Sequence, residues 1–126
     1  MIDHRSACPV SCALDIIGDK WTLVVLRSIM TGKHRYSDLL AMPEGISTNI
    51  LADRLQLLER EGLVSRHSYQ VRPPRYEYRL TRKGADLLPV VQAMMDWSYR
   101  HISGCIDLPT VYRAAKPEEL YPEAEE

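Results

Sequence analysis

Apolar and polar positions along the first sixty residues follow the period of an α-helix. The first apolar stripe repeats at i, i+3, i+4 and i+7 and comprises Val10, Ala13, Leu14 and Ile17. Pro9 suits the first position of this helix, which makes Cys8 its N-cap, and Gly18 suits its end. Residues 20–30 are apolar nearly all round and predict a second helix in the middle of the core, capped by Asp19.

Two more helices are predicted before Gly62, which suits the end of the second of them. Ser37 is expected to cap a short helix. A longer helix is expected over residues 47–61, with Ser47 as its N-cap. The inward stripe of this longer helix comprises Leu51, Leu55 and Leu58.

The sequence then changes to the pattern of β-strands. Residues 63–80 contain two runs that predict the strands of a hairpin. Pro73 and Pro74 lie between the two runs. Because proline has no N–H group for a strand ladder, these two residues predict the bend.

A last helix is predicted over residues 82–102, with Thr81 as its cap and a kink or break at Pro89. A short helix and a longer one joined by a turn, followed by a hairpin, are typical of a winged helix-turn-helix. The expected fold class is mainly α with a small antiparallel β-hairpin wing. Residues 1–108 form the expected DNA-binding and dimerisation domain, which pairs through its N- and C-terminal helices. Residues 109–126 form an acidic, partly disordered tail.

The net charge of −1 hides an uneven distribution of charged residues. Residues 117–126 hold five acidic side chains and no basic one. The rest of the chain carries 16 basic and 12 acidic side chains, a net charge of +4. Residues 66–83 alone hold six Lys or Arg and one Glu. Because binding follows the local field rather than the total, the composition does not exclude nucleic acid as a partner.

The outward face of the helix over residues 47–61 is small, polar and able to hydrogen-bond, as a helix in the major groove requires. Two arginines flank the prolines of the wing and suit the DNA backbone or a narrow minor groove. The candidate DNA-binding residues are Ser37, Ser47, Thr48, Asn49, Ala52, Asp53, Gln56, Arg72 and Arg75. The helix face alone is more often an ordinary solvated surface, and only its combination with the turn and the basic wing favours DNA.

Three segments together resemble the HxlR-type winged helix-turn-helix transcriptional regulators of bacteria and archaea. They are CPVSCALDIIGDKWTLVVLRSI, RYSDLLAMPEGISTNILADRLQLLEREGLVSR and YEYRLTRKGADLLPVVQAMMDW, and they extend over about residues 8–102. The resemblance implies a homodimer that regulates transcription, often by repression, with residues 47–61 in the major groove and residues 63–80 as the wing. The segment ISTNIL departs from the family, which usually has more amide or basic residues there, so base preferences are not carried over.

The last helix has more apolar surface than one side of a helix requires. Such a terminal helix needs a partner, either its own domain or a second copy of the chain. The candidate dimer-interface residues are Leu87, Val91, Met94, Met95, Trp97 and Ile102. A two-fold dimer would present two recognition helices about 34 Å apart, which matches a palindromic operator.

Cys8 is the one residue with a suggestion of covalent chemistry. As an N-cap its sulfur would lie at the positive end of the helix, with His4 and Arg5 close in sequence, and both effects lower a thiol pKa. Cys8 is therefore a candidate redox sensor, a role that the resemblance also implies for some family members, and an unreactive capping thiol is the alternative. His4, Cys8 and Cys12 repeat at intervals of four, but Pro9 argues against one continuous helix, and no metal site is expected.

No catalytic residue and no cofactor are expected, because the sequence has no Ser-His-Asp motif, phosphate loop or dinucleotide fingerprint. The lack of a signal peptide and of a long apolar run favours a cytoplasmic location away from membranes. The first hypothesis is a homodimeric, sequence-specific regulator, expected to be a repressor, that binds double-stranded DNA and responds to a small-molecule or oxidant effector. The alternatives are a winged-helix protein–protein interaction module without DNA binding and, more remotely, a thiol-based enzyme.

Overall fold

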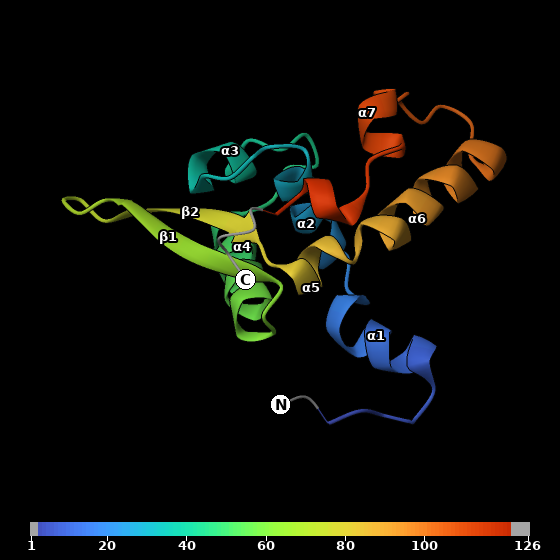
Figure 1. Cartoon of the computed structure of the whole chain (residues 1–126), viewed down its shortest axis with the longest axis horizontal. Helices are drawn as coiled ribbons and strands as arrows, with labels where there is room; N and C mark the ends of the chain where they lie inside the picture. Colours follow the sequence, from blue (N-terminus) through green and yellow to red (C-terminus); the bar gives the residue numbers. More distant parts are fainter. Residues whose placement is uncertain (1–2, 122–126) are drawn as a thin grey trace.

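The computed structural model describes residues 3–121. Its elements in chain order are α1 (Pro9–Ile17), α2 (Thr22–Met30), α3 (Tyr36–Leu40), α4 (Thr48–Arg60), β1 (Val64–Gln70), β2 (Arg75–Leu80), α5 (Arg82–Ala85), α6 (Leu88–His101), α7 (Thr110–Arg113) and the 3-10 turn η1 (Pro117–Glu119). Figure 1 shows the hairpin extending from one side of a helical body and α6 extending from the other. This architecture confirms the predicted fold class, mainly α with a small antiparallel wing.

Helix α2 is the centre of the core. Val25 and Leu26 are fully buried, and the helix packs against α3, α4, β2 and α6. A helix that is apolar nearly all round is stable only where neighbours cover its sides, so the predicted central position is confirmed. The helix begins at Thr22, two residues later than expected. The Asp19 carboxylate nevertheless accepts a hydrogen bond from the Thr22 N–H at 3.1 Å, as a cap does.

Helix α4 is oriented by its leucines and fixed at both ends. Its inward stripe is buried and comprises Leu51, Leu55 and Leu58. Ser47 is the predicted N-cap, and its Oγ accepts a hydrogen bond from the Ile50 N–H at 3.2 Å. At the other end Gly62 has a φ of +75°, and the Leu63 N–H donates to the Leu58 carbonyl at 2.8 Å. These features form a Schellman motif, which confirms the predicted end of the helix.

Helix α3 begins earlier than the sequence predicts. The expected N-cap, Ser37, lies inside the helix, and Arg35 occupies the N-cap position without a side-chain cap. The reason lies in the sheet. The Tyr78 N–H donates to the His34 carbonyl at 2.7 Å, and Arg35 forms a β-bridge with Glu77. This pairing holds the backbone before α3 in an extended conformation, so the helix begins directly after it.

Strands β1 and β2 form the predicted antiparallel hairpin. The register pairs Val64 with Leu80 at the base of the hairpin and becomes irregular towards its tip. At the tip the Gln70 side-chain amide donates to the carbonyls of Arg72, at 3.3 Å, and Pro73, at 3.2 Å. These bonds stabilise the turn that carries Arg72 and Arg75.

The last predicted helix is divided in two, as a proline inside a helix requires. Helix α5 ends at Ala85, and α6 begins at Leu88, so that Pro89 lies in the first turn of α6. Thr81 is the N-cap of α5, because its Oγ1 accepts a hydrogen bond from the Gly84 N–H at 3.1 Å. The break lets α6 leave the body in a direction of its own, as Figure 1 shows.

Residues 109–121 return to the helical body after α6. The Gln92 side-chain amide donates to the carbonyls of Tyr112, at 3.1 Å, and Ala115, at 2.8 Å, and η1 lies against α5. The division of the chain into a domain and an acidic tail stays a prediction. The end of that predicted tail, residues 122–126, lies outside the described residues.

Candidate nucleic-acid interface

The outward face of α4 is not covered by the described part of the chain. The predicted DNA-binding side chains on and before this helix are all exposed: Ser47, Thr48, Asn49, Ala52, Asp53 and Gln56. A groove of about 540 Å³ lies beside this face, and its other lining residues include Tyr36, Arg66 and Tyr78. The structure therefore places the polar helix face and the base of the wing along one groove.

Arg54 links the outward face of α4 to the start of α2. Its guanidinium lies 2.9 Å from the Asp53 carboxylate and 3.3 Å from that of Asp19. Its Nε is buried without a hydrogen-bond partner among residues 3–121. The pKa of Asp19 is lowered overall. Burial alone would raise this pKa, but hydrogen bonds from Thr22 and from the Trp21 N–H, together with the charge of Arg54, outweigh the effect of burial. Because Asp53 is already paired, its charge opposes a nearby phosphate less than a free carboxylate would.

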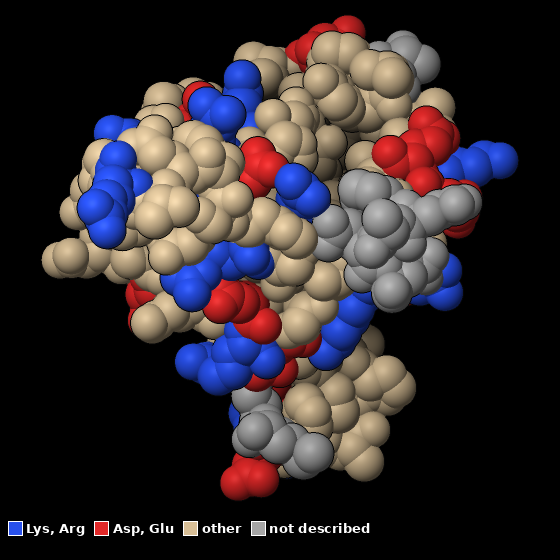
Figure 2. Space-filling view, turned by 60° about the vertical axis from the view of Figure 1, so that its left-hand side comes forward, with Lys and Arg blue, Asp and Glu red and all other residues tan. Residues whose placement is uncertain are grey.

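The arginines of the wing differ in how strongly the chain itself engages them. Arg66 lies 3.6 Å from the Glu59 carboxylate and over the ring of Tyr76. Arg72 and Arg75, at the tip, are exposed, and their side chains have no ion pair or hydrogen bond within the described residues. Figure 2 looks towards the wing and shows Lys and Arg side chains separated by uncharged surface, with acidic side chains between some of them. The two tip arginines are therefore available to phosphates.

Ser37 lies across from the wing tip rather than on the α4 face. It lines a hollow of about 370 Å³ together with Arg75 and the two prolines of the tip. Tyr36 lines both this hollow and the groove beside α4, and its hydroxyl donates to the Thr48 carbonyl at 3.3 Å. Sequence reasoning missed Tyr36, because no sequence period indicates that its ring lies between the wing and α4.

Cys8 occupies the predicted N-cap position of α1 and is exposed. The Cys8 side chain makes no N-cap hydrogen bond. The backbone N–H groups of the first turn, chiefly that of Ser11, nevertheless lower the pKa of the thiol. The two basic residues that the sequence places near it are engaged elsewhere. His4 and Arg5 lie 3.1 and 2.6 Å from the Asp15 carboxylate. The helix terminus, rather than a cationic neighbour, is therefore the cause of the lowered pKa.

The predicted dimer-interface residues fall into two groups. Three are exposed by about half and are available to a partner: Met94, Trp97 and Ile102. Three lie in the core of their own domain or pack against it: Leu87, Val91 and Met95. On α1, Val10 is 67% and Leu14 49% exposed. Fewer of the predicted α6 residues are therefore exposed to a second copy of the chain than expected. The exposed apolar side chains of α1 enlarge the surface available to that copy.

The ionisable groups of the described chain do not gather into a metal site. Residues 3–121 hold no cluster of three or more His, Cys, Asp or Glu side chains placed to bind a metal ion. All three cysteines are free thiols, and the Cys12 thiol donates to the Ser6 carbonyl at 3.4 Å. No helix in the same range is long and apolar enough to cross a membrane.

The family model of the HxlR-like helix-turn-helix matches residues 16–104. The chain belongs to the HxlR-like family. The HTH-type transcriptional regulator YdeP of Bacillus subtilis strain 168 is 37% identical over 99 residues, which span 79% of this HxlR-like chain and 77% of YdeP. The redox regulator HypR, in its oxidized form, is similar with a TM-score of 0.67 at 34% identity, covering 80% of this chain and 100% of HypR. The reduced form of the regulator YodB of B. subtilis has a TM-score of 0.64 at 28% identity, covering 80% of this chain and 100% of YodB.

Membership confirms the resemblance that the three sequence segments indicate. HxlR-like proteins are helix-turn-helix transcriptional regulators, and the relatives are named as regulators rather than enzymes. The match includes α3 and α4, the two helices joined by the turn, and the whole of the β1–β2 wing. Residues 105–121 are described by the structure but lie outside the family match.

Proposed function

We propose that this HxlR-like protein is a homodimeric, sequence-specific repressor that binds double-stranded DNA in the cytoplasm. The helix over residues 47–61 enters the major groove of a palindromic operator, and the wing over residues 63–80 contacts the backbone or the minor groove. One observation supports this most. The uncovered polar face of α4 and the base of the wing lie along one groove. The tip of the same wing carries Arg72 and Arg75, whose side chains are unpaired in the described chain.

The two surfaces have different tasks in this proposal. Asn49 and Gln56 carry amides that can form two hydrogen bonds with adenine, and the Thr48 hydroxyl is a tolerant contact. The N-terminus of α4 adds backbone N–H groups and a positive dipole that favour a phosphate. Arg72 and Arg75 contact phosphates of any sequence, so they position the protein and add affinity without selecting bases.

Replacing Asn49 by alanine tests the specificity of α4. We expect the Asn49→Ala variant to lose about 1–3 kcal/mol of discrimination at one base pair in each half-site, because a two-pronged contact to a base is worth that much. The measurement is selection of bound duplexes from a random library, compared with the wild-type protein. The salt dependence of binding should not change, because no phosphate contact is removed. Selection of the same sequences with the same discrimination would exclude Asn49 from base recognition.

A dimer is supported by the large apolar side chains that remain exposed on α1 and near the end of α6. Trp97 and Ile102 near the end of α6 and Leu14 on α1 are about half exposed. Large exposed apolar side chains are typical of surfaces that a second chain covers. Two-fold pairing places the two copies of α4 about one turn of DNA apart, which is the geometry of a palindrome.

We further propose that oxidation at Cys8 modulates DNA binding. The support is an exposed thiol whose pKa is lowered at a helix N-terminus. The similar structures include a protein named as a redox regulator, HypR. Because α1 leads directly through Asp19 to Arg54 and so to α4, a change at α1 has a short path to the helix that contacts DNA.

Alkylation rates test the state of this thiol. In a Cys12→Ser/Cys105→Ser variant, the rate of reaction with iodoacetamide should rise with pH through a midpoint below the ordinary thiol pKa of about 8.5. The folded state lowers the thiol pKa, so more of the reactive thiolate exists at neutral pH than in the unfolded chain. The same variant unfolded in urea is the control and should give the ordinary midpoint. Identical midpoints in the two states would remove the sensor proposal but leave the DNA-binding proposal intact.

The alternative is a winged-helix module that binds a protein instead of DNA. It is favoured by one observation, the 76% exposure of the apolar Val71 at the wing tip. Association with a partner protein that survives nuclease treatment, without any retardation of duplex DNA, would establish this alternative and end the first proposal.

A further inference from the structure

The hydroxyl of Tyr78 has no hydrogen-bond partner among residues 3–121. Tyr78 belongs to β2, and only 9% of its surface is exposed. A tyrosine hydroxyl that is buried so deeply ordinarily forms a hydrogen bond, because an unpaired buried polar group is unfavourable. In the described chain, Arg54 Nε is the one fully enclosed side-chain polar atom without a partner. The Tyr78 hydroxyl therefore keeps an opening to the surface.

Tyr78 lines two hollows that adjoin each other. One is the groove of about 540 Å³ beside α4, and the other is the hollow of about 370 Å³ between α3 and the wing tip. Tyr36 also lines both. We call the second one the tyrosine hollow, because its lining includes Tyr36, Tyr69, Tyr76 and Tyr78. A DNA strand that borders α4 can therefore continue across the tyrosine hollow towards the wing tip.

The lining of the tyrosine hollow favours an anion. Its one charged lining residue within the described chain is Arg75, whose side chain has no ion pair or hydrogen bond there. The guanidinium of Arg35 lies over the ring of Tyr69, 4.0 Å from its centre, and adds a second positive charge nearby. The remaining lining residues are tyrosines, prolines and Ser37. A phosphate in this hollow therefore meets no carboxylate from the described lining.

Burial keeps the Tyr78 hydroxyl in its protonated form. Burial raises the pKa of Tyr78, and the positive charge of Arg66, which acts in the opposite direction, does not offset this effect. A protonated tyrosine hydroxyl donates a hydrogen bond, and the oxygens of a DNA phosphate accept such bonds from tyrosine. The unpaired hydroxyl is therefore a donor at neutral pH.

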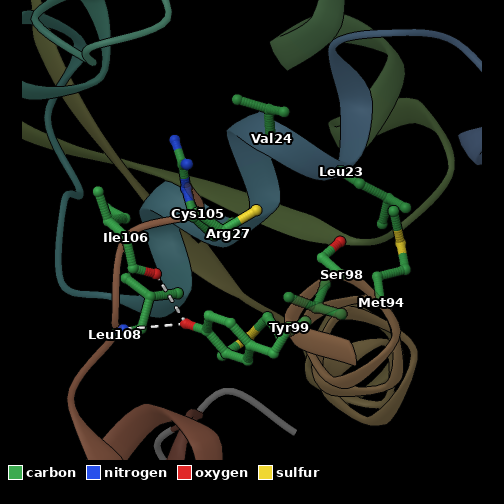
Figure 3. A pocket seen from close by; sticks show the side chains of 11 residues that line it. Leu23, Val24, Arg27, Met94, Ser98, Tyr99, Cys105, Ile106 and Leu108 are labelled. Atoms are coloured by element: carbon green, nitrogen blue, oxygen red, sulfur yellow. Dashed lines mark hydrogen bonds between the residues drawn. The ribbon is translucent and has the colours of Figure 1, made fainter. Parts of the chain in front are cut away.

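The apolar hollow between α2 and α6 is a separate surface (Figure 3). It shares no lining residue with the tyrosine hollow, and its walls include the candidate dimer-interface residues Met94 and Met95. A phosphate beside Tyr78 and a second copy of the chain beside α6 therefore occupy different parts of the molecule, so both copies of a dimer can present the tyrosine hollow to DNA.

We propose that the tyrosine hollow holds one phosphate of the DNA backbone in each half-site, with the Tyr78 hydroxyl and the Arg75 guanidinium as its donors. The inference rests on the proposed DNA binding and adds to it a contact from Tyr78, which no sequence period indicates. The hydroxyl carries no charge, so it positions the backbone without releasing counterions, whereas Arg75 releases them.

Tyr78→Phe in the full chain removes this one hydroxyl. We expect affinity for a random-sequence duplex to fall about tenfold for each copy, or about a hundredfold for the homodimer, because each half-site loses a hydrogen bond to a charged group. The slope of log affinity against log salt should stay unchanged, because no positive charge is removed. The melting temperature should stay the same or rise, because the hydroxyl has no partner within the described chain.

Tyr112→Phe is the matched control. It is the same substitution on α7, on the other side of the helical body from the wing (Figure 1), and it should retain the wild-type affinity. Ethylation of single phosphates in a duplex selected by the wild-type protein gives a second measurement. One phosphate in each half-site should weaken binding of the wild-type protein when it is ethylated, but not binding of Tyr78→Phe.

The possible results separate this inference from the proposed function. Wild-type affinity of Tyr78→Phe, or the same ethylation pattern in both proteins, would overturn the inference and leave the DNA-binding proposal intact. A loss of affinity with a lower melting temperature and an unchanged ethylation pattern would assign Tyr78 a structural role and would also overturn it. Failure of the wild-type protein to bind any duplex would overturn both proposals.

Discussion

The Arg72→Ala/Arg75→Ala variant should bind duplex DNA roughly 10,000-fold more weakly than the wild-type protein at low salt, because the homodimer loses four arginines. Hydrogen bonds to charged groups contribute about 1.5 kcal/mol or more each, and neither arginine has a partner in the described chain that would compete with a phosphate. The slope of log affinity against log salt should decrease by about four units, because the homodimer loses four phosphate contacts and each lost contact removes about 0.9 of a unit. Titration of a random-sequence duplex at several salt concentrations measures both quantities.

A matched control separates this contact from a general loss of positive charge. Arg100 and Arg113 belong to α6 and α7, which lie on the opposite side of the helical body from the wing (Figure 1). The Arg100→Ala/Arg113→Ala variant carries the same change of net charge and should retain the wild-type slope. If both double variants lose the same affinity and the same slope, the wing tip has no special part in binding.

Gly84→Ala should destabilise the protein by about 3 kcal/mol, the upper part of the range for overpacked sites. Gly84 lies inside α5, where helix propensity alone predicts that alanine stabilises by about 1 kcal/mol. A Cβ at this position, however, would overlap the carbonyl oxygen of Leu63 and lie 2.9 Å from its carbonyl carbon. That carbonyl is fixed, because it accepts a hydrogen bond from the Thr81 N–H at 3.1 Å. Urea unfolding, or a fall in melting temperature of roughly 10 °C, measures the effect.

Gly104→Ala is the control for this substitution. Gly104 has a φ of +88° with nothing within 4 Å of an added Cβ, so alanine there costs only the strain of a left-handed backbone, about 1 kcal/mol. We expect Gly84→Ala to be clearly less stable than Gly104→Ala. A Gly84→Ala variant as stable as the wild type would show that α5 can move away from the start of β1.

The elements that local signals define were predictable from the sequence. Ser47 and Gly62 delimit α4 because a cap and a left-handed glycine act within a few residues of themselves. Pro89 divides the last helix for an equally local reason. The three leucines of α4 also determine which side of the helix faces outward, so the polar face of the candidate site was found without a structure.

Features that depend on distant segments were not predictable in this way. Ser37 is a good capping residue, yet pairing of Arg35 with Glu77 starts the helix before it. The need for glycine at position 84 comes from the approach of Leu63, which no periodicity reveals. Residues 109–121 lack a periodic pattern because isolated contacts hold them: hydrogen bonds from the Gln92 amide and the packing of Ala115, Leu120 and Tyr121 against the core.

Within the candidate site, the same distinction explains what the sequence missed. A free carboxylate at Asp53 would be unfavourable near phosphates. Its pairing with Arg54, and the link from Arg54 to Asp19, depend on the contact of α4 with the start of α2, which no sequence pattern reveals. Cys8 was found because a helix N-terminus is a local feature. The sequence could not show that Asp15, on the next turns of α1, engages both His4 and Arg5.

Selection of duplexes from a random library by the full-length wild-type protein tests the central claim most directly. If α4 and the wing bind DNA as proposed, the selected pool will converge on two inverted half-sites whose centres are about ten base pairs apart. A pool that keeps its random composition, recovered from correctly folded protein at moderate salt, would contradict the claim that this surface reads DNA.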